Sequence, residues 1–434
     1  MATVLVLLFF FSLSTSILPS YGFDPLDPQG NITIRWDLMS SSGTNDLKVT
    51  IFNQQLYRHI EPPGWKLKWH WLGKEVIWDM RGAEATEQGN CSEFKTGNLP
   101  HSCERAPVIV DLLPGAPYNM QTKNCCKGGV LSSLKQDPSL SVATFQLSVS
   151  GGGAADSAGF EMPVNFSLGV PGYSCSNGTE VKATKFPLDG RRWTQALKTW
   201  NVTCMYSPSL ASPTPKCCVS LSAFYDSNIV PCPKCSCSCQ GQPGSKCVKF
   251  GETPSLLKQK EDPNEVSKPV VRCTQHMCPI RVHWHVKQNY KQYWRVKMTV
   301  TNFNIMKNYS DWNLVVLHPN LKSLTQVFSF NYSPLGQYGY FNDTGMFWGL
   351  KFYNQMLVQE GVNGNVQSEI LLAKDTGNFT FKQGWAFPRR ITFNGDECVM
   401  PQPDDYPKLP NDANSARSSH FLTILAFMLV VIML

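Results

Sequence analysis

Asn31-Ile-Thr-Ile-Arg-Trp36 and Leu47-Lys-Val-Thr-Ile-Phe52 are the stretches that decide the fold. Each alternates polar residues with apolar or β-branched ones, which is the period of two that a half-buried β-strand shows. Helical periodicity is scarce, and 31 Gly and 30 Pro supply turns. The chain is therefore expected to be all-β, with two β-sandwich-like domains and a disulfide-rich segment between them. The same alternation returns in four further runs, at residues 108–112, 143–149, 294–300 and 379–381.

The composition indicates folded domains with a mild positive charge. Of the 434 residues, 42% are hydrophobic and 16% are charged, so the chain can bury a core and is not expected to be disordered. The formal net charge is +7 and is spread along the chain. This distribution argues against a nucleic-acid-binding arm, and it suits a surface that tolerates acidic polysaccharide outside the cell.

The first apolar end of the chain is a candidate export signal. Residues 4–18 carry no charge, and Ser20 and Gly22 place small residues three and one positions before a cut after Gly22. This layout predicts a secretory signal peptide over residues 1–22. The first three residues hold no Lys or Arg, so a retained signal anchor stays as the alternative.

The second apolar stretch, residues 421–434, is too short for a typical spanning helix, which needs roughly 20 apolar residues. Small residues, a polar spacer and a short apolar tail are the layout of a glycosylphosphatidylinositol (GPI) attachment signal. We expect attachment at Asn411, with Asn414 as the alternative, and removal of residues 412–434. The expected location is the extracellular face of the plasma membrane, with a lipid in its outer leaflet.

Composition shifts divide the chain between these ends. A Gly-rich loop near residue 151, a Pro-rich run from residue 207 and a polar stretch from residue 250 suggest boundaries. The expected parts are a β domain over 23–170, a disulfide-rich segment over 171–250, a linker over 251–270, a second β domain over 271–400 and an extended stalk over 401–411.

The 16 cysteines are an even number, as expected for disulfides in a secreted chain. Their densest group runs from Cys217 to Cys247 and contains a C-x-x-C spacing at Cys232 and Cys235. We expect a disulfide knot there, because thiols oxidise in the secretory pathway; zinc binding by thiolates is the alternative. The sequence does not fix the pairing.

Nine Asn-x-Ser/Thr sequons agree with an extracellular chain, since glycosylated Asn residues must lie on the surface. Asn90 is a weaker acceptor because Cys91 is its middle residue. The expected sites are Asn31, Asn90, Asn165, Asn177, Asn201, Asn308, Asn331, Asn342 and Asn378.

A tryptophan-rich segment is the best candidate for binding. Trp65, Trp69 and Trp71 share one parity of an expected strand, and Trp78 follows on the next one. Indole rings on a strand face can stack on the flat faces of sugar rings, which predicts a polysaccharide-binding platform. The same alternation is also typical of a strand whose Trp side chains face the core, and both interpretations stay open.

The sequence offers little for catalysis or metal binding. His283 and His285 lie on one face of an expected strand, about 7 Å apart, but no third ligand is near in sequence, so packing is favoured over a metal site. Common nucleophile, zinc-protease and phosphate-binding motifs are missing. Glu75 and Asp79 would be about 13 Å apart on a strand, too far for glycoside hydrolysis. No enzyme activity, cofactor or metal is expected.

Several stretches together resemble the COBRA family of plant cell-surface glycoproteins. Cys217-Cys218-Val219-Ser220 matches that family's signature element, and the likeness covers nearly all of the chain between its two ends. One departure is His101-Ser102-Cys103, where relatives carry a Cys pair after Pro-His, so the pairing of Cys103 stays open. The other matching stretches are residues 27–33, 75–78, 124–129, 277–287 and 384–390.

The resemblance implies a non-enzymatic, GPI-anchored and N-glycosylated protein of the plasma membrane and cell wall. It also implies an N-terminal domain like a carbohydrate-binding module, with cellulose or another β-glucan as partner and a role in microfibril deposition, oriented cell expansion or wall thickening. Two other functions stay open. One is a protein scaffold that organises wall synthesis at the outer membrane face, and the other is an anchored enzyme acting on wall polysaccharide.

Overall fold

The computed structural model describes residues 24–408, apart from several internal gaps. The gaps are 95–96, 151–159, 188–191, 212–213, 234–245, 248–271, 274–277, 305–306, 337–342, 355, 358–363 and 375–384. The predicted signal peptide, linker, GPI site and propeptide lie outside the described residues, as do Asn342 and Asn378. Within the described part of the chain, no helix is long and apolar enough to cross a membrane.

The chain forms two compact units, Met1–Pro213 and Thr214–Leu434. Regular structure in the described residues is β-strands and short 3₁₀ turns, so the prediction of an all-β fold is confirmed. The turns are η1 (Tyr118–Met120), η2 (Pro138–Leu140), η3 (Pro208–Leu210), η5 (Pro319–Ser323) and η6 (Pro403–Asp405).

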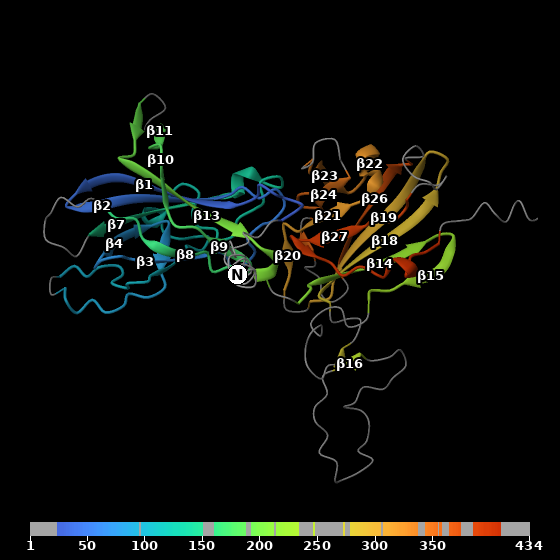
Figure 1. Ribbon diagram of the computed structural model, residues 1–434, viewed down its shortest axis with the longest axis horizontal. Helices are drawn as coiled ribbons and strands as arrows, with labels where there is room; N and C mark the ends of the chain where they lie inside the picture. Colours follow the sequence, from blue (N-terminus) through green and yellow to red (C-terminus); the bar gives the residue numbers. More distant parts are fainter. Residues whose placement is uncertain are drawn as a thin grey trace, which may run out of the picture. The chain divides into compact units, whose positions relative to one another are not determined.

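The N-terminal unit packs two antiparallel sheets face to face (Figure 1). The larger sheet has the order β10-β13-β1-β2-β7-β4, with β9 also paired to β13. Its strands are β1 (Ile32–Ser42), β2 (Thr44–Asn53), β4 (Val76–Arg81), β7 (Val142–Ser150), β9 (Tyr173–Cys175), β10 (Thr179–Val181) and β13 (Lys198–Tyr206). The smaller sheet has the order β5-β6-β3-β8, formed by β3 (Lys66–His70), β5 (Ala83–Ala85), β6 (Val108–Asp111) and β8 (Val164–Ser167).

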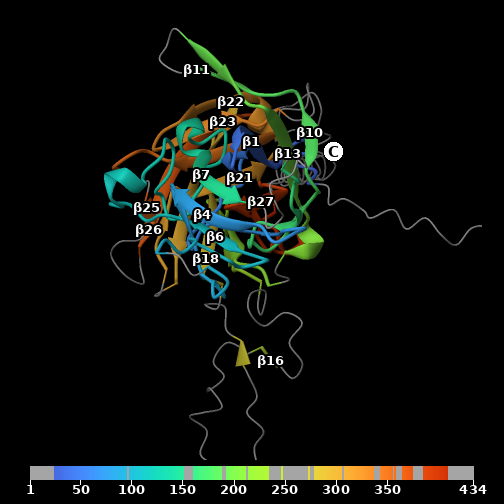
Figure 2. The same cartoon turned by 90° about the vertical axis from the view of Figure 1, so that its left-hand side faces the viewer.

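The alternation that predicts the strands also fixes which side chains form this core. In β1 the buried residues Ile32, Ile34 and Trp36 alternate with half-exposed ones. A further hairpin, β11 (Lys185–Pro187) and β12 (Trp193–Gln195), projects from the larger sheet beyond β10 (Figure 1 and Figure 2).

The C-terminal unit also packs two sheets around one core. The first has the order β15-β14-β18-β19-β26-β22: β14 (Cys217–Ala223), β15 (Asp226–Val230), β18 (Ile280–Asn289), β19 (Tyr293–Asn302), β22 (Leu324–Val327) and β26 (Asn365–Ala373). The second has the order β23-β24-β21-β27-β28: β21 (Asn313–Leu317), β23 (Phe330–Pro334), β24 (Thr344–Gly349), β27 (Arg390–Phe393) and β28 (Asp396–Glu397). Two short pairs are β16 (Lys246–Cys247) with β17 (Arg272–Cys273), and β20 (Tyr309–Ser310) with β25 (Met356–Leu357).

The structure divides the predicted disulfide-rich segment 171–250 between the two units. Strands β9, β10 and β13 complete the larger N-terminal sheet, because Trp200, Val202 and Cys204 fill its core. Strands β14 and β15 instead join β18, and β14 runs parallel to it. The described part of the predicted stalk also differs from a free spacer, since Tyr406 packs on Trp385 and Phe387.

Three cysteines of the predicted knot, Cys217, Cys218 and Cys232, form disulfides rather than a zinc site. Cys217 bonds Cys398, and Cys218 bonds Cys232. No cysteine is free among the described residues. Disulfides also join Cys91 to Cys103, Cys125 to Cys126 and Cys175 to Cys204.

Candidate functional site

The tryptophan row of the N-terminal unit belongs to its core. Trp65, Trp69 and Trp71 are each 1% exposed or less, and they point from the inner face of the smaller sheet. The Trp69 ring meets Trp36 of the larger sheet edge to face, with centroids 5.0 Å apart. The prediction that these three side chains form a glycan-binding platform is therefore wrong, because a buried ring has no face open to a polymer.

The local sequence holds this row in place by close backbone contact. Gly64 and Gly129 lie so near each other that a Cβ on Gly64 would come within 2.2 Å of the Gly128 carbonyl oxygen. The amide of Trp65 also donates to the carbonyl of Gly129 at 3.0 Å. Glycine is required here by both the space and a φ of +88° at Gly64.

Trp78 is the one predicted glycan-binding residue that is not in the core. It sits at an irregularity in the pairing of edge strand β4 with β7, and its side chain is half-buried. Its indole packs edge to face on Phe94, at 5.3 Å, and its N–H donates to the hydroxyl of Ser150. The Cys91–Cys103 disulfide closes the loop that carries Phe94.

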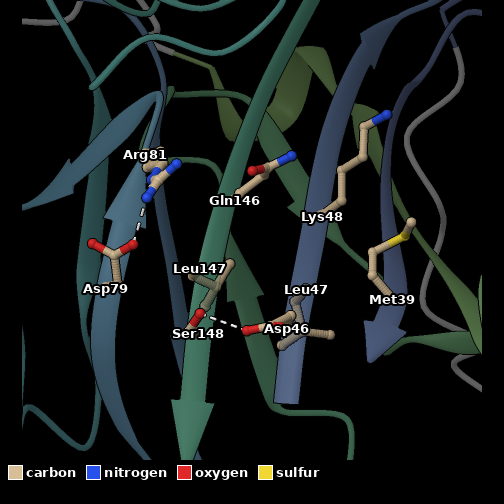
Figure 3. Close-up of a pocket in the computed structure, with 9 residues that line it drawn as sticks. All are labelled: Met39, Asp46, Leu47, Lys48, Asp79, Arg81, Gln146, Leu147 and Ser148. Carbon is tan, nitrogen blue, oxygen red and sulfur yellow. Dashed lines mark hydrogen bonds and ion pairs between the residues drawn. The ribbon is translucent and has the colours of Figure 1, made fainter. Parts of the chain in front are cut away.

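The outer face of the larger sheet carries the strongest candidate site. Strand pairing places Lys48, Gln146 and Arg81 in one row across β2, β7 and β4. A second row joins Asp46, Ser148 and Asp79. These side chains lie on one side of the sheet (Figure 3). They line a hollow of about 330 Å³. Met39, Leu47 and Leu147 complete its lining.

Hydrogen bonds and charges hold this face in order. Ser148 donates to Asp46 at 2.6 Å, as does Ser40, while Arg81 pairs with Asp79 at 3.5 Å. The two rows together therefore present ammonium, guanidinium, amide, hydroxyl and carboxylate groups side by side. Such a set both donates to and accepts from the hydroxyl groups of a sugar polymer.

One end of the hollow approaches the β11–β12 hairpin. The ammonium of Lys48 lies 4.2 Å from the ring centre of Phe186 in β11, a cation–π contact. Burial lowers the pKa of Lys48, and the neighbouring Asp37 carboxylate opposes that shift. Trp193 of β12 is 68% exposed, so this hairpin offers the open aromatic surface that β3 does not.

The comparisons with known proteins cover both units. The COBRA N-terminal domain matches residues 46–207, and the COBRA family C-terminal domain matches residues 216–407. The chain belongs to the COBRA family. COBRA-like protein 6 of Arabidopsis thaliana is 63% identical over 399 residues, covering 91% of this chain and 87% of the relative. Protein COBRA of Arabidopsis thaliana is 54% identical over 425 residues, covering 96% and 93%.

The likeness extends to rice. COBRA-like protein 1 of Oryza sativa subsp. japonica is 54% identical over 440 residues, covering 99% of this chain and 97% of the relative. The COBRA resemblance of the Cys-Cys-Val-Ser element is thus confirmed at the level of the family, and its relatives are plant proteins.

The COBRA signature element begins β14, and its serine contacts His283 of the predicted histidine pair. The Ser220 hydroxyl lies 2.6 Å from His283 Nδ1, and Ser222 lies between His283 Nε2 and His285 Nδ1 at 2.8 and 2.7 Å. Burial, together with the neighbouring His285, Arg281 and Lys297, lowers the pKa of His283 to about 4. Among the described residues, no three His, Cys, Asp or Glu side chains are grouped to hold a metal.

Two carboxyl groups near the start of the described chain, Asp24 and Asp27, are largely buried. Asp24 accepts hydrogen bonds from the Tyr57 hydroxyl and the Arg58 guanidinium, and Asp27 accepts one from the Leu56 amide at 2.7 Å. Asp27 is 5% exposed. Burial raises the pKa of the Asp27 carboxyl to about 6.

This shift predicts that Asp27 makes the N-terminal unit less stable as the pH rises from about 4 to 6. Between these pH values the folded state keeps a proton that the unfolded state has lost. The contribution of Asp27 to the free energy of unfolding is therefore fully present below pH 4 and is lost above pH 6, a change of about 3 kcal/mol. Asp27→Asn should remove it. Unfolding free energies of both proteins at several pH values test this, and parallel curves would contradict it.

Seven of the nine sequon asparagines lie in the described chain. Asn90, Asn165, Asn177 and Asn308 are exposed and thus open to a glycan. Asn31, Asn201 and Asn331 are half-buried. Asn201 projects from the outer face of the larger sheet opposite Arg35, and β1 lies between its strand and β2.

Proposed function

We propose that this COBRA-family chain is a non-enzymatic cell-surface glycoprotein that binds cellulose or another β-glucan on the outer face of the larger N-terminal sheet. The observation that carries the proposal is the hollow over β2, β7 and β4, lined by two rows of hydrogen-bonding side chains. A GPI lipid then keeps the protein at the outer membrane face, where it guides microfibril deposition and oriented cell expansion or wall thickening.

The chemistry of the face favours a neutral polymer of sugars. Its charges are balanced, since Lys48 and Arg81 stand beside Asp46 and Asp79. The face therefore selects for hydroxyl groups rather than for a net charge on the ligand. Half-buried Trp78 and exposed Trp193 supply aromatic rings near the two opposite edges of the sheet. Stacking of a sugar ring on each adds about 0.5–1.5 kcal/mol to the binding free energy.

The same contacts support binding rather than hydrolysis. Asp79 is paired with Arg81, and Asp46 accepts hydrogen bonds from two hydroxyl groups. A glycoside hydrolase needs one carboxyl group that holds a proton for the leaving group. Both carboxyl groups here are occupied as acceptors or ion-pair partners of neighbouring side chains. Weak sites on many anchored copies gain avidity from their high effective concentration.

A double substitution on this face tests the proposal. Lys48→Ala with Gln146→Ala removes two neighbouring hydrogen-bonding groups from one row, and we expect binding to insoluble cellulose to weaken about 10-fold or more. The measurement is a depletion isotherm with full-length secreted protein. Unchanged binding would contradict the site.

A matched control lies on the other sheet of the same unit. Lys66 and Lys68 are exposed on the outer face of β3, so Lys66→Ala with Lys68→Ala removes surface charge without touching the hollow. This control should bind cellulose as the wild type does.

Release of soluble sugars from labelled glucan during the same assay would instead favour the enzyme hypothesis. Binding to membrane proteins but not to glucan would favour the scaffold hypothesis.

A further inference from the structure

The C-terminal unit exposes a second flat face, on the sheet β15-β14-β18-β19-β26-β22. The inner positions of β18 and β19 hold core residues such as Val282, Trp284 and Met298. The outer positions of these two strands and of the neighbouring β26 are polar or charged. They are Arg281, His283, His285 and Lys287 in β18, Arg295, Lys297 and Thr299 in β19, and Gln367 and Glu369 in β26.

Strand pairing orders these side chains into rows. His283 lies opposite Ser220 on one side and Thr299 on the other, and Thr299 lies opposite Gln367. The next row runs from Ser222 through His285 and Lys297 to Glu369. The hydroxyls of β14 hold both imidazoles, so this surface is a fixed array of hydrogen-bonding groups.

The face is cationic, unlike the one on the N-terminal unit. Its single carboxylate in the described residues, Glu369, pairs with both Lys287 and Arg295. Arg281 and Lys297 form no ion pair with any described residue. The Arg281 guanidinium lies 4.9 Å from the ring centre of Phe303, which fixes its position. The positive surroundings also act with burial to lower the pKa of His285.

We infer that this face binds a linear polysaccharide that carries carboxylates, as in a chain of uronic acids. Arg281 and Lys297 are four positions apart along neighbouring strands, which is roughly 14 Å. One small anion cannot contact both, whereas an extended polymer with repeated carboxylates can. The hydroxyls of such a chain meet Thr299 and the imidazoles between the two cations, and Gln367 beside Thr299.

The half-buried setting of these cations favours a polymer over a lipid surface. Arg281, His283, His285 and Lys297 are all half-buried in the sheet face. A flat membrane contacts side chains that project beyond the protein, while a thin polymer chain can lie along β18 and β19 and cross the rows. This face is on another unit and takes another polymer, so the inference does not rest on the glucan site.

Polygalacturonate and its fully methyl-esterified form are the decisive probes, because the ester keeps the polymer and removes its charge. We expect full-length secreted protein to bind the free acid, more weakly as salt rises, and to leave the ester unbound. Equal binding of the two forms, or no binding of the free acid, would overturn the inference. This comparison uses only the wild-type protein.

Substitutions then place the site. Arg281→Gln with Lys297→Gln should weaken polygalacturonate binding about 10-fold or more and leave cellulose binding unchanged. Lys66→Gln with Lys68→Gln removes the same charge from the N-terminal unit and should have little effect. Equal losses in the two variants would mean that net charge alone attracts the polymer. Arg281→Lys with Lys297→Arg should keep binding if the loss comes from charge rather than misfolding.

Vesicles separate the polymer from a membrane partner. We expect phosphatidylcholine vesicles that contain phosphatidylglycerol to bind no better to the wild type than to the Arg281→Gln, Lys297→Gln variant. Vesicle binding that depends on these two residues, without binding to polygalacturonate, would contradict the assignment.

Discussion

Trp69→Ala is expected to unfold the N-terminal unit rather than to remove a sugar-binding ring. Trp69 is fully buried, and its indole meets Trp36 and Trp71 with centroids 5.0 and 5.4 Å away. Truncating a buried aromatic side chain costs about 3–5 kcal/mol, which is a large share of the stability of a typical domain. Denaturant unfolding, followed by Trp fluorescence under oxidising conditions, measures this loss.

An exposed tryptophan of the same unit provides the control. Trp193 is 68% exposed, so Trp193→Ala should change the free energy of unfolding by less than about 0.5 kcal/mol. If Trp69→Ala stayed as stable as the wild type but no longer bound cellulose, the core assignment of the tryptophan row would be wrong.

Removal of the Cys217–Cys398 disulfide is the second substitution with a large expected effect. This bond links residues 181 positions apart and joins β14 to the end of the C-terminal unit. In the chain-entropy account, a loop of that size stabilises the folded state by about 5 kcal/mol. We expect Cys217→Ala with Cys398→Ala to lower the unfolding midpoint of the C-terminal unit strongly.

The Cys91–Cys103 disulfide is a matched comparison, because it closes a loop of only 12 positions. Its stabilisation in the same account is about 3 kcal/mol, so Cys91→Ala with Cys103→Ala should cost less. Both double variants avoid a free thiol. Equal losses, or a larger loss for the shorter loop, would contradict the ranking.

The alternation of residues predicts the strands and their inner faces well. It places Ile32, Ile34 and Trp36 on one side of β1, and Trp65, Leu67, Trp69 and Trp71 on one side of β3, as the structure has them. It does not say whether that side meets solvent or a second sheet. The meeting of Trp36 with Trp69 depends on packing between strands that are far apart in sequence, and no local pattern shows it.

The candidate glucan face was missed for the same reason. Asp46, Lys48, Gln146 and Ser148 are ordinary polar positions of two predicted strands, and only the pairing of β2 with β7 makes them neighbours. The sequence predicts that His283 and His285 lie on one face of a strand. Their contacts with Ser220 and Ser222 depend on the parallel pairing of β14 with β18, whose paired residues are more than 60 positions apart in the sequence. The predicted segment 171–250 is defined by its many cysteines. That criterion does not separate the alternating residues of β13, which belong to the N-terminal sheet, from the cysteines that follow.

Amine footprinting in the presence of cellohexaose tests the central claim most directly. Lys48 lines the hollow on the larger sheet, while Lys66 and Lys68 lie on the outer face of the smaller sheet, so one protein carries both the probe and its controls. Mass spectrometry after acetylation of the secreted protein reports each lysine separately. The account predicts that the sugar protects Lys48 and leaves Lys66 and Lys68 as reactive as before. Protection of Lys66 and Lys68 with no change at Lys48 would contradict it.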